Sequence, residues 1–141
     1  MRVVAFAPSL VAVEAEDGGL NANGFPMTSC YVEEMPAEIT IPVVIAVCGL
    51  AGEECDAVRY LIATSPQGEK ISTMQFGWQW QDDPELPVEY QVFVQRLPVQ
   101  INQPGIYTLG LYQTAEGGDT PHSFPLPIFE ANDPFLAPRS L

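Results

Sequence analysis

Apolar side chains alternate with polar or small ones along much of this chain, most regularly between residues 39 and 101. A period of two residues places one face of a strand in a core and the other toward solvent. No segment shows the period of about 3.6 residues that marks an amphipathic helix. The pattern therefore predicts strands, and it is clearest at the odd positions of residues 39–48, which are Ile39, Ile41, Val43, Ile45 and Val47.

Turn residues divide the chain into about eight such strands, a number typical of a β-sandwich. Asp17-Gly18-Gly19 predicts a hairpin between residues 3–15 and residues 20–25. The turn at residues 65–69 predicts a second hairpin. The expected fold is all-β, an antiparallel two-layer β-sandwich. Its later strands are expected from Val58 onward and at residues 70–81, 90–101, 107–111 and 122–128.

Prolines and a change of phase give finer expectations. Proline has no N–H to donate to a ladder, so Pro42, Pro125 and Pro127 predict strands at sheet edges. Apolar residues occupy even positions up to Val94 and odd positions from Leu97 onward. Such a slip predicts a β-bulge close to Gln95 or Pro98.

The length of 141 residues suits one domain, in which roughly 68% of the unfolded surface becomes buried. We expect the sandwich to span residues 1–130. Residues 131–141 contain two prolines and no alternation, which predicts a flexible C-terminal tail.

The chain is strongly acidic, with 18 acidic and 5 basic residues and a formal net charge of −13. Binding to nucleic acid or to an anionic membrane needs clusters of Lys and Arg, so neither is expected. The hydrophobic content of 47% argues against a disordered chain. A compact acidic protein can also imitate the phosphates of DNA and occupy a basic groove, which is one alternative function.

The cysteines and the first residues bear on the compartment. Cys30, Cys48 and Cys55 are odd in number and have no CxxC spacing, so a disulfide framework or a zinc site is not indicated. The apolar stretch of residues 3–13 is short, is interrupted by Pro8 and follows a single Arg, which makes a poor secretory signal. We therefore expect a cytoplasmic protein.

Several short segments resemble a family of small single-domain bacterial β-proteins of unassigned function, known only as a domain of unknown function. The resemblance implies an immunoglobulin-like or C2-like sandwich and no assigned activity, and no role for Arg59 follows from it. The segments that carry it are Ala7-Pro8-Ser9, residues 18–25, Met35-Pro36-Ala37, residues 65–68 and residues 103–109.

Catalytic chemistry is weakly represented. General acid–base or nucleophilic catalysis needs a polar group beside a base, usually histidine. His122 is the single histidine, and its parity with Phe124 and Leu126 favours a partly covered strand residue. A dyad of His122 with Cys48 or Cys55 stays open, but we expect no enzyme.

Two further patterns are candidate binding sites. The acidic segments Glu53-Glu54-Cys55-Asp56 and Asp82-Asp83-Pro84-Glu85 are able to offer carboxylates to calcium, but they lack the Gly and Asn offsets of calcium loops. Trp78 and Trp80 share a face with Met74 and Phe76, which favours an inner packed layer over a sugar-stacking surface.

The function predicted from the sequence is a non-enzymatic module that binds another protein or a second copy of itself, without cofactor or metal. Edges marked by prolines and the acidic loops are the expected contacts. A nucleic-acid mimic and a carbohydrate- or calcium-binding sandwich are the alternatives. The candidate contact residues are Glu53, Glu54, Asp56, Asp82, Asp83, Glu85, Trp78 and Trp80.

Overall fold

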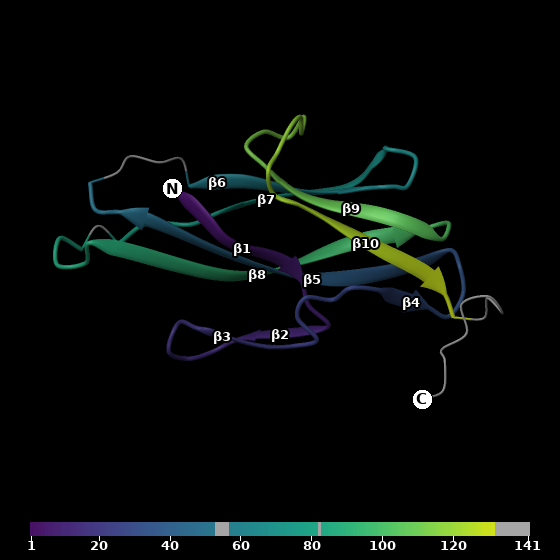
Figure 1. Cartoon of the computed structure of the whole chain (residues 1–141), viewed down its shortest axis with the longest axis horizontal. Coiled ribbons are helices and arrows are strands. Elements are labelled where there is room, and N and C mark those ends of the chain that lie inside the picture. The colour runs from purple at the N-terminus through teal and green to yellow at the C-terminus, as the bar shows by residue number, and fades with distance from the viewer. Residues whose placement is uncertain (53–56, 82, 132–141) are drawn as a thin grey trace.

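The structure is a computed structural model that describes residues 1–52, 57–81 and 83–131. These residues form ten strands and no helix (Figure 1). The strands are β1 (Arg2–Pro8), β2 (Val11–Glu14), β3 (Leu20–Asn23), β4 (Cys30–Val32), β5 (Ala37–Leu50), β6 (Val58–Thr64), β7 (Lys70–Gly77), β8 (Val88–Ile101), β9 (Gly105–Tyr112) and β10 (Ser123–Glu130).

The strands form two main sheets and a separate hairpin. One sheet has the order β1-β5-β8, the other has the order β4-β10-β9-β6-β7, and β2 pairs with β3. All pairs are antiparallel except β4 with β10. The predicted all-β sandwich is confirmed. The sequence did not indicate β4, because a strand of three residues is too short to show alternation.

The main core lies between the two sheets. From the three-stranded sheet, Val43, Ile45 and Leu97 are completely buried. They meet apolar residues of the five-stranded sheet such as Leu61 and Leu109 in one continuous cluster. The inward odd positions of β5 are therefore confirmed. Burial of these side chains is the main source of stability of the fold.

A second, small core lies on the other face of the three-stranded sheet. There the β2–β3 hairpin covers Val44 of β5 and Val94 of β8 with its own Ala12 and Leu20. Figure 1 shows this hairpin on the side of β5 and β8 that faces away from β6 and β9. The guanidinium of Arg96 also donates to the Ala12 carbonyl at 3.1 Å. Neighbouring residues of β5 are consequently buried on opposite faces of the sheet: Val43 and Ile45 in the main core and Val44 in the small core.

This second core explains why the predicted bulge near Gln95 or Pro98 is wrong. β5 and β8 pair without a register shift from Ala37↔Ile101 to Leu50↔Val88. The apolar residues on even positions point outward, and Val94 is buried there by the hairpin. The change of phase thus marks two buried faces of one regular strand.

The expectation for Pro42 is also wrong, because β5 is the central strand of its sheet. β1 pairs with β5 only as far as Pro8↔Val43, and beyond that point the Pro42 carbonyl accepts the Ser9 N–H at 2.8 Å. Pro42 is tolerated because the ladder with β1 has ended at its position.

Pro125 and Pro127 lie in β10, which is an edge only over part of its length. β4 pairs with residues 128–130 of β10, so residues 123–127 pair with β9 alone. The His122 carbonyl accepts the Leu111 N–H of β9, so alternation turns the two proline nitrogens away from β9. The expectation that Pro125 and Pro127 lie at a sheet edge is therefore correct for residues 123–127 of β10.

Both predicted hairpins are present. β2 pairs with β3, and Gly18 in their turn has a φ of 87°, a conformation that favours glycine. β6 pairs with β7. In their turn, the Ser65 hydroxyl oxygen accepts the N–H groups of Gln67 and Glu69 at 3.3 and 3.1 Å. Local turn chemistry therefore sets the register of both hairpins.

At the C-terminal end, the Ala131 N–H still donates to the Val32 carbonyl at 2.7 Å. The rest of the expected tail, residues 132–141, lies outside the described residues. No helix in the described part of the chain is long and apolar enough to cross a membrane.

Substitutions on the two faces of β8 should differ in how much they lower the free energy of unfolding. We expect Leu97→Ala to lower the free energy of unfolding by about 2–5 kcal/mol, because it leaves a cavity in the main core. Tyr90→Ser on the outer face should change it by less than about 0.5 kcal/mol. Urea unfolding followed by circular dichroism measures both. A larger loss for Tyr90→Ser than for Leu97→Ala would contradict the assigned faces.

Candidate functional site

The outer face of the three-stranded sheet is covered over only part of its length. Beyond the β2–β3 hairpin, apolar side chains continue at the end of β5 and the start of β8. Leu50 lies opposite Val88, and Cys48 lies opposite Tyr90. Leu50 is 64% exposed and Tyr90 is 63% exposed. We call this area the open face, and define it by Cys48, Leu50, Leu86, Val88 and Tyr90.

The open face is hollowed on both sides of Tyr90. A depression of about 360 Å³ is lined by Arg2, Cys48, Leu50 and Tyr90 among others. A smaller one, of about 240 Å³, runs from Tyr90 and Leu86 to Gly18 at the tip of the hairpin. A protruding aromatic ring between two hollows is a geometry that fits a contoured protein surface.

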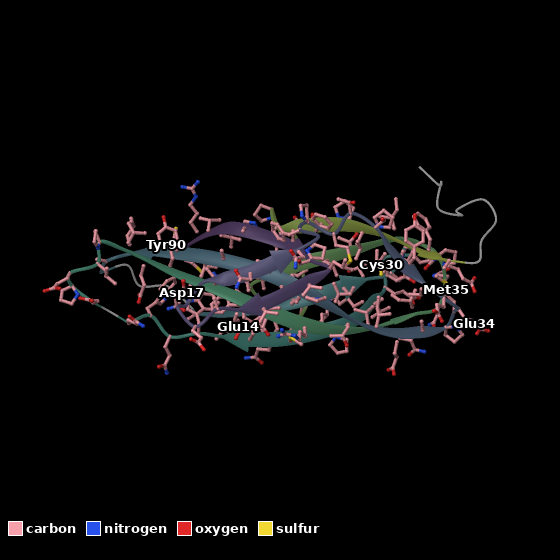
Figure 2. All side chains as sticks on the ribbon, turned by 90° about the horizontal axis from the view of Figure 1, so that it is seen from below. Glu14, Asp17, Cys30, Glu34, Met35 and Tyr90 are labelled. Carbon is pink, nitrogen blue, oxygen red and sulfur yellow. The ribbon has the colours of Figure 1, made fainter. Side chains whose placement is uncertain are left out.

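Acidic side chains border the open face. Figure 2 views the molecule from the hairpin side and shows Tyr90, Asp17 and Glu14 toward the same end. Glu14 and Asp17 are exposed, and Glu89 is part of the lining of the smaller hollow. Arg2 is the basic residue that lines the hollow beside Leu50. An apolar centre with a mainly negative border therefore characterises this surface.

The two predicted acidic loops leave the sandwich from neighbouring strand ends at the same place. The Ala51 N–H donates to the Pro87 carbonyl at 3.0 Å, which joins the segments leading into them. Asp83 and Glu85 are exposed, and the Asp83 carboxylate accepts the Glu85 N–H at 2.9 Å. Glu53, Glu54, Asp56 and Asp82 lie outside the described residues.

Within residues 1–52, 57–81 and 83–131, no three His, Cys, Asp or Glu side chains are grouped so that they could hold a metal ion. Calcium binding through the two acidic loops stays a prediction, because four of their carboxylates belong to residues that are not described.

Trp78 and Trp80 follow β7 and belong to an aromatic cluster at the edge of the main core. The Trp78 ring lies 5.3 Å from the Phe93 ring and 5.9 Å from the Trp80 ring, measured between centroids. The Trp80 ring packs so closely on Gly49 that a Cβ there would lie 3.3 Å from it. Both indole nitrogens are buried. The interpretation as packed residues is confirmed, and it weakens sugar stacking, which needs an exposed ring face.

His122 and Cys48 line different hollows of the surface. His122 precedes β10, and its N–H donates to the Thr120 hydroxyl oxygen at 3.1 Å. Cys48 lies on the open face, whereas Cys55 lies outside the described residues. Burial raises the pKa of the Cys30 thiol, which keeps it protonated and a poor nucleophile.

The sequence pattern contains a signal for the open face. Cys48 and Leu50 occupy outward positions of β5, Val88 and Tyr90 occupy outward positions of β8, and Leu86 precedes β8. The apolar even positions of β8 produce the apparent change of phase. The hairpin accounts for Val94, and the remaining outward residues Val88 and Tyr90 form part of the open face.

No family model matches this chain, and neither a curated protein nor a solved structure matches it. The resemblance to a bacterial family therefore stays a prediction, and the fold is known from the structure itself.

The packing of the tryptophans is testable by substitution. We expect Trp78→Ala or Trp80→Ala to lower the free energy of unfolding by about 3 kcal/mol, because each ring fills space beside the core. Tyr31→Ala, at a ring that is 50% exposed, serves as control and should cost less than about 1 kcal/mol. Tryptophan fluorescence measured against urea concentration gives the free energy of unfolding of each variant. Quenching by acrylamide, which is neutral, reports how accessible the remaining indole rings are. Full stability of both tryptophan variants would contradict the packed arrangement.

Proposed function

We propose that this protein is a non-enzymatic binding module whose open face docks onto another protein. The observation that supports the proposal is that the β2–β3 hairpin covers only one part of the outer face of the three-stranded sheet. Val44 and Val94 are only 6% exposed beneath the hairpin, whereas Leu50 and Tyr90 on the same face are more than 60% exposed. Clustered apolar exposure of this kind is a mark of interaction sites.

Tyr90 has the properties of an interface anchor. Tyrosine is enriched among residues that dominate binding energy, because its large ring buries much area and its hydroxyl retains a polar contact. Leu50 and Val88 beside it lie on a regular strand pair, so the backbone beneath them is rigid before any partner arrives. A preformed surface loses little entropy on binding.

The charge around the open face indicates the chemistry of the partner. Glu14, Asp17 and Asp83 are exposed acids, and the whole chain carries a net charge of −13. A second copy of the chain would be repelled by this charge. A protein with an apolar patch bordered by Lys and Arg is complementary, and the attraction would speed its association.

The proline-marked edge of β10 is a weaker candidate for contact than the open face. Residues 123–127 of β10 lack a second partner strand, but Pro125 and Pro127 remove two N–H donors there. An added strand would find an incomplete ladder at this edge. Direct pairing of a partner with this edge of β10 therefore has less support than docking on the sheet face.

A nucleic-acid mimic remains the alternative function, and it differs in what holds the complex together. A mimic depends on charge, so its binding would weaken steeply with salt and would not need Tyr90. Binding through the apolar centre of the open face should behave differently. Salt would slow the association, but the affinity would depend mainly on Leu50 and Tyr90.

The test compares three forms of the protein as bait in an extract of its own cells, followed by affinity measurements with the purified partner. The double variant Leu50→Ser/Tyr90→Ser should bind at least about 30-fold more weakly, equal to about 2 kcal/mol, as expected for removal of an anchor. Ile106→Ser is the matched control, since Ile106 is 59% exposed on the other sheet. It should bind as the unaltered chain does.

Equal affinity of the double variant and the unaltered chain would overturn the assignment of the open face. Competition by DNA for the same partner, together with that equal affinity, would favour the nucleic-acid mimic. Concentration-dependent self-association that the double variant abolishes would instead identify a second copy as the occupant.

A further inference from the structure

The strand β8 forms a free edge of the three-stranded sheet, because among the described strands it pairs with β5 alone. The direction of its backbone groups follows from the residue just before it, since the Pro87 carbonyl accepts the Ala51 N–H on the β5 side. In an antiparallel pair, the backbone groups of successive residues point to alternate sides. The N–H and C=O groups of Val88, Tyr90 and Val92 therefore point away from β5.

These outward backbone groups have no hydrogen-bond partner in the part of the chain that the structure describes. The segment after β7 passes close by, but it bonds to side chains of β8 instead. The Gln81 N–H donates to the Glu89 carboxylate at 2.7 Å, and the Gln91 side-chain amide donates to the Gln79 carbonyl at 3.4 Å. The edge therefore offers its N–H and C=O groups to a further strand.

A hollow of about 240 Å³ follows this edge. Every residue from Val88 to Val92 lines it, although successive side chains of a strand point to opposite faces of the sheet. A hollow that touches both sets of side chains has to lie along the edge of the strand. Gly18 at the tip of the hairpin borders it on the outer face, and Gln81, bonded to the inward Glu89, borders it on the inner face.

The hollow suits an extended chain better than a compact ligand. Sites for small molecules usually enclose about 300–1,000 Å³, which is more than this hollow provides. An extended segment needs less enclosed volume, because its backbone bonds to the edge and only alternate side chains need pockets. Tyr90 is exposed and Val92 is half-buried, so alternate side chains of an added strand would lie beside the open face.

The other end of β8 is closed to such pairing. The Ser72 hydroxyl of β7 donates to the Pro98 carbonyl at 2.6 Å, and Pro98 itself has no N–H to offer. Prolines and covering contacts of this kind protect an edge from added strands. Residues 88–92 contain no proline. The unprotected edge is therefore the part of β8 that also carries the open face.

The border of the groove is acidic. Glu89 lines it, and the exposed Asp17 lies in the hairpin turn beside it. Asp83 and Glu85 are exposed and precede Leu86, another residue of the lining. Lys and Arg are absent from the described residues of this lining. Basic side chains on an added segment would be attracted here, whereas a second copy of the chain, with its net charge of −13, would be repelled.

We propose that an extended segment of the partner protein, apolar and basic at alternate positions, adds to the edge of β8 beside residues 88–92 as a fourth strand of this sheet. The inference rests on the proposed function, because the apolar side chains of the segment continue the open face next to Tyr90. It adds the way in which the partner is held. Main-chain hydrogen bonds give affinity, and the alternate side chains give specificity.

Amide hydrogen exchange of the full chain, followed for each residue by NMR, tests the inference with a defined probe. The probe is a short synthetic peptide of alternating lysine and valine. In the isolated protein the amides of Val88, Tyr90 and Val92 should exchange rapidly, whereas those of Glu89 and Gln91, which face β5, should exchange slowly. Saturating peptide should slow the exchange of the three edge amides by at least about tenfold.

Val92→Pro removes one outward N–H and leaves the ladder with β5 in place, so it should weaken peptide binding by about tenfold. Gln75→Pro is the matched control, because Gln75 is exposed on β7, the edge strand of the other sheet. The Trp78 N–H donates to the Ala57 carbonyl, so alternation turns the Gln75 N–H away from β6. This control should bind the peptide as the unaltered chain does.

A peptide of the same sequence with N-methylated backbone amides keeps the test decisive if Val92→Pro does not fold. It lacks the donors that an added strand needs, so it should bind the unaltered chain at least about tenfold more weakly.

Absence of saturable peptide binding, binding that leaves the three edge amides in rapid exchange, or equal weakening by Gln75→Pro would overturn strand addition. Equal binding of a peptide of alternating glutamate and valine would overturn the basic chemistry of the segment. Slower exchange of the edge amides with rising protein concentration alone would overturn the proposal in favour of a second copy. Docking on the open face is judged separately, with the purified partner and the Leu50→Ser/Tyr90→Ser variant, so it stands if strand addition alone fails.

Discussion

The central strand β5 is buried on both of its faces, and this burial determines how the neighbouring strands are arranged. Its odd side chains, such as Val43 and Ile45, fill the core between the sheets, and Val44 lies beneath the β2–β3 hairpin. Its backbone pairs with β1 on one side and β8 on the other. Because the hairpin covers only part of this sheet, Leu50 at the end of the same strand stays exposed. The open face is thus a consequence of where the second core ends.

Much of the fold followed from local patterns, since alternation and turn residues depend only on neighbours in the sequence. The errors arose where distant segments meet. The sequence around Pro42 is typical of an edge strand, and only the structure shows that Pro42 lies in a central strand at the point where β1 ends. Val94 resembles a slipped strand until the hairpin is placed over it. Periodicity reports how many faces are apolar, but it does not say which segment covers each face.

The candidate sites were less predictable than the fold, for the same physical reason. Gly18, Gln81 and Val92 come from three separate segments and have no motif in common, yet one groove collects all three. The tryptophans were the reverse case, because their shared parity with Phe76 already indicated packing beside the core.

Hydroxyl-radical footprinting can measure whether the outer face of the three-stranded sheet is covered in one half and open in the other. Tyrosine and leucine react with hydroxyl radicals faster than valine does, so the rate of each residue is divided by its rate in the unfolded chain, and this normalised rate reports exposure. We expect rapid oxidation of Leu50 and Tyr90 and protection of Val44 and Val94 in the isolated protein. Equal rates for the two pairs, or protection of Tyr90 in the isolated monomer, would contradict it.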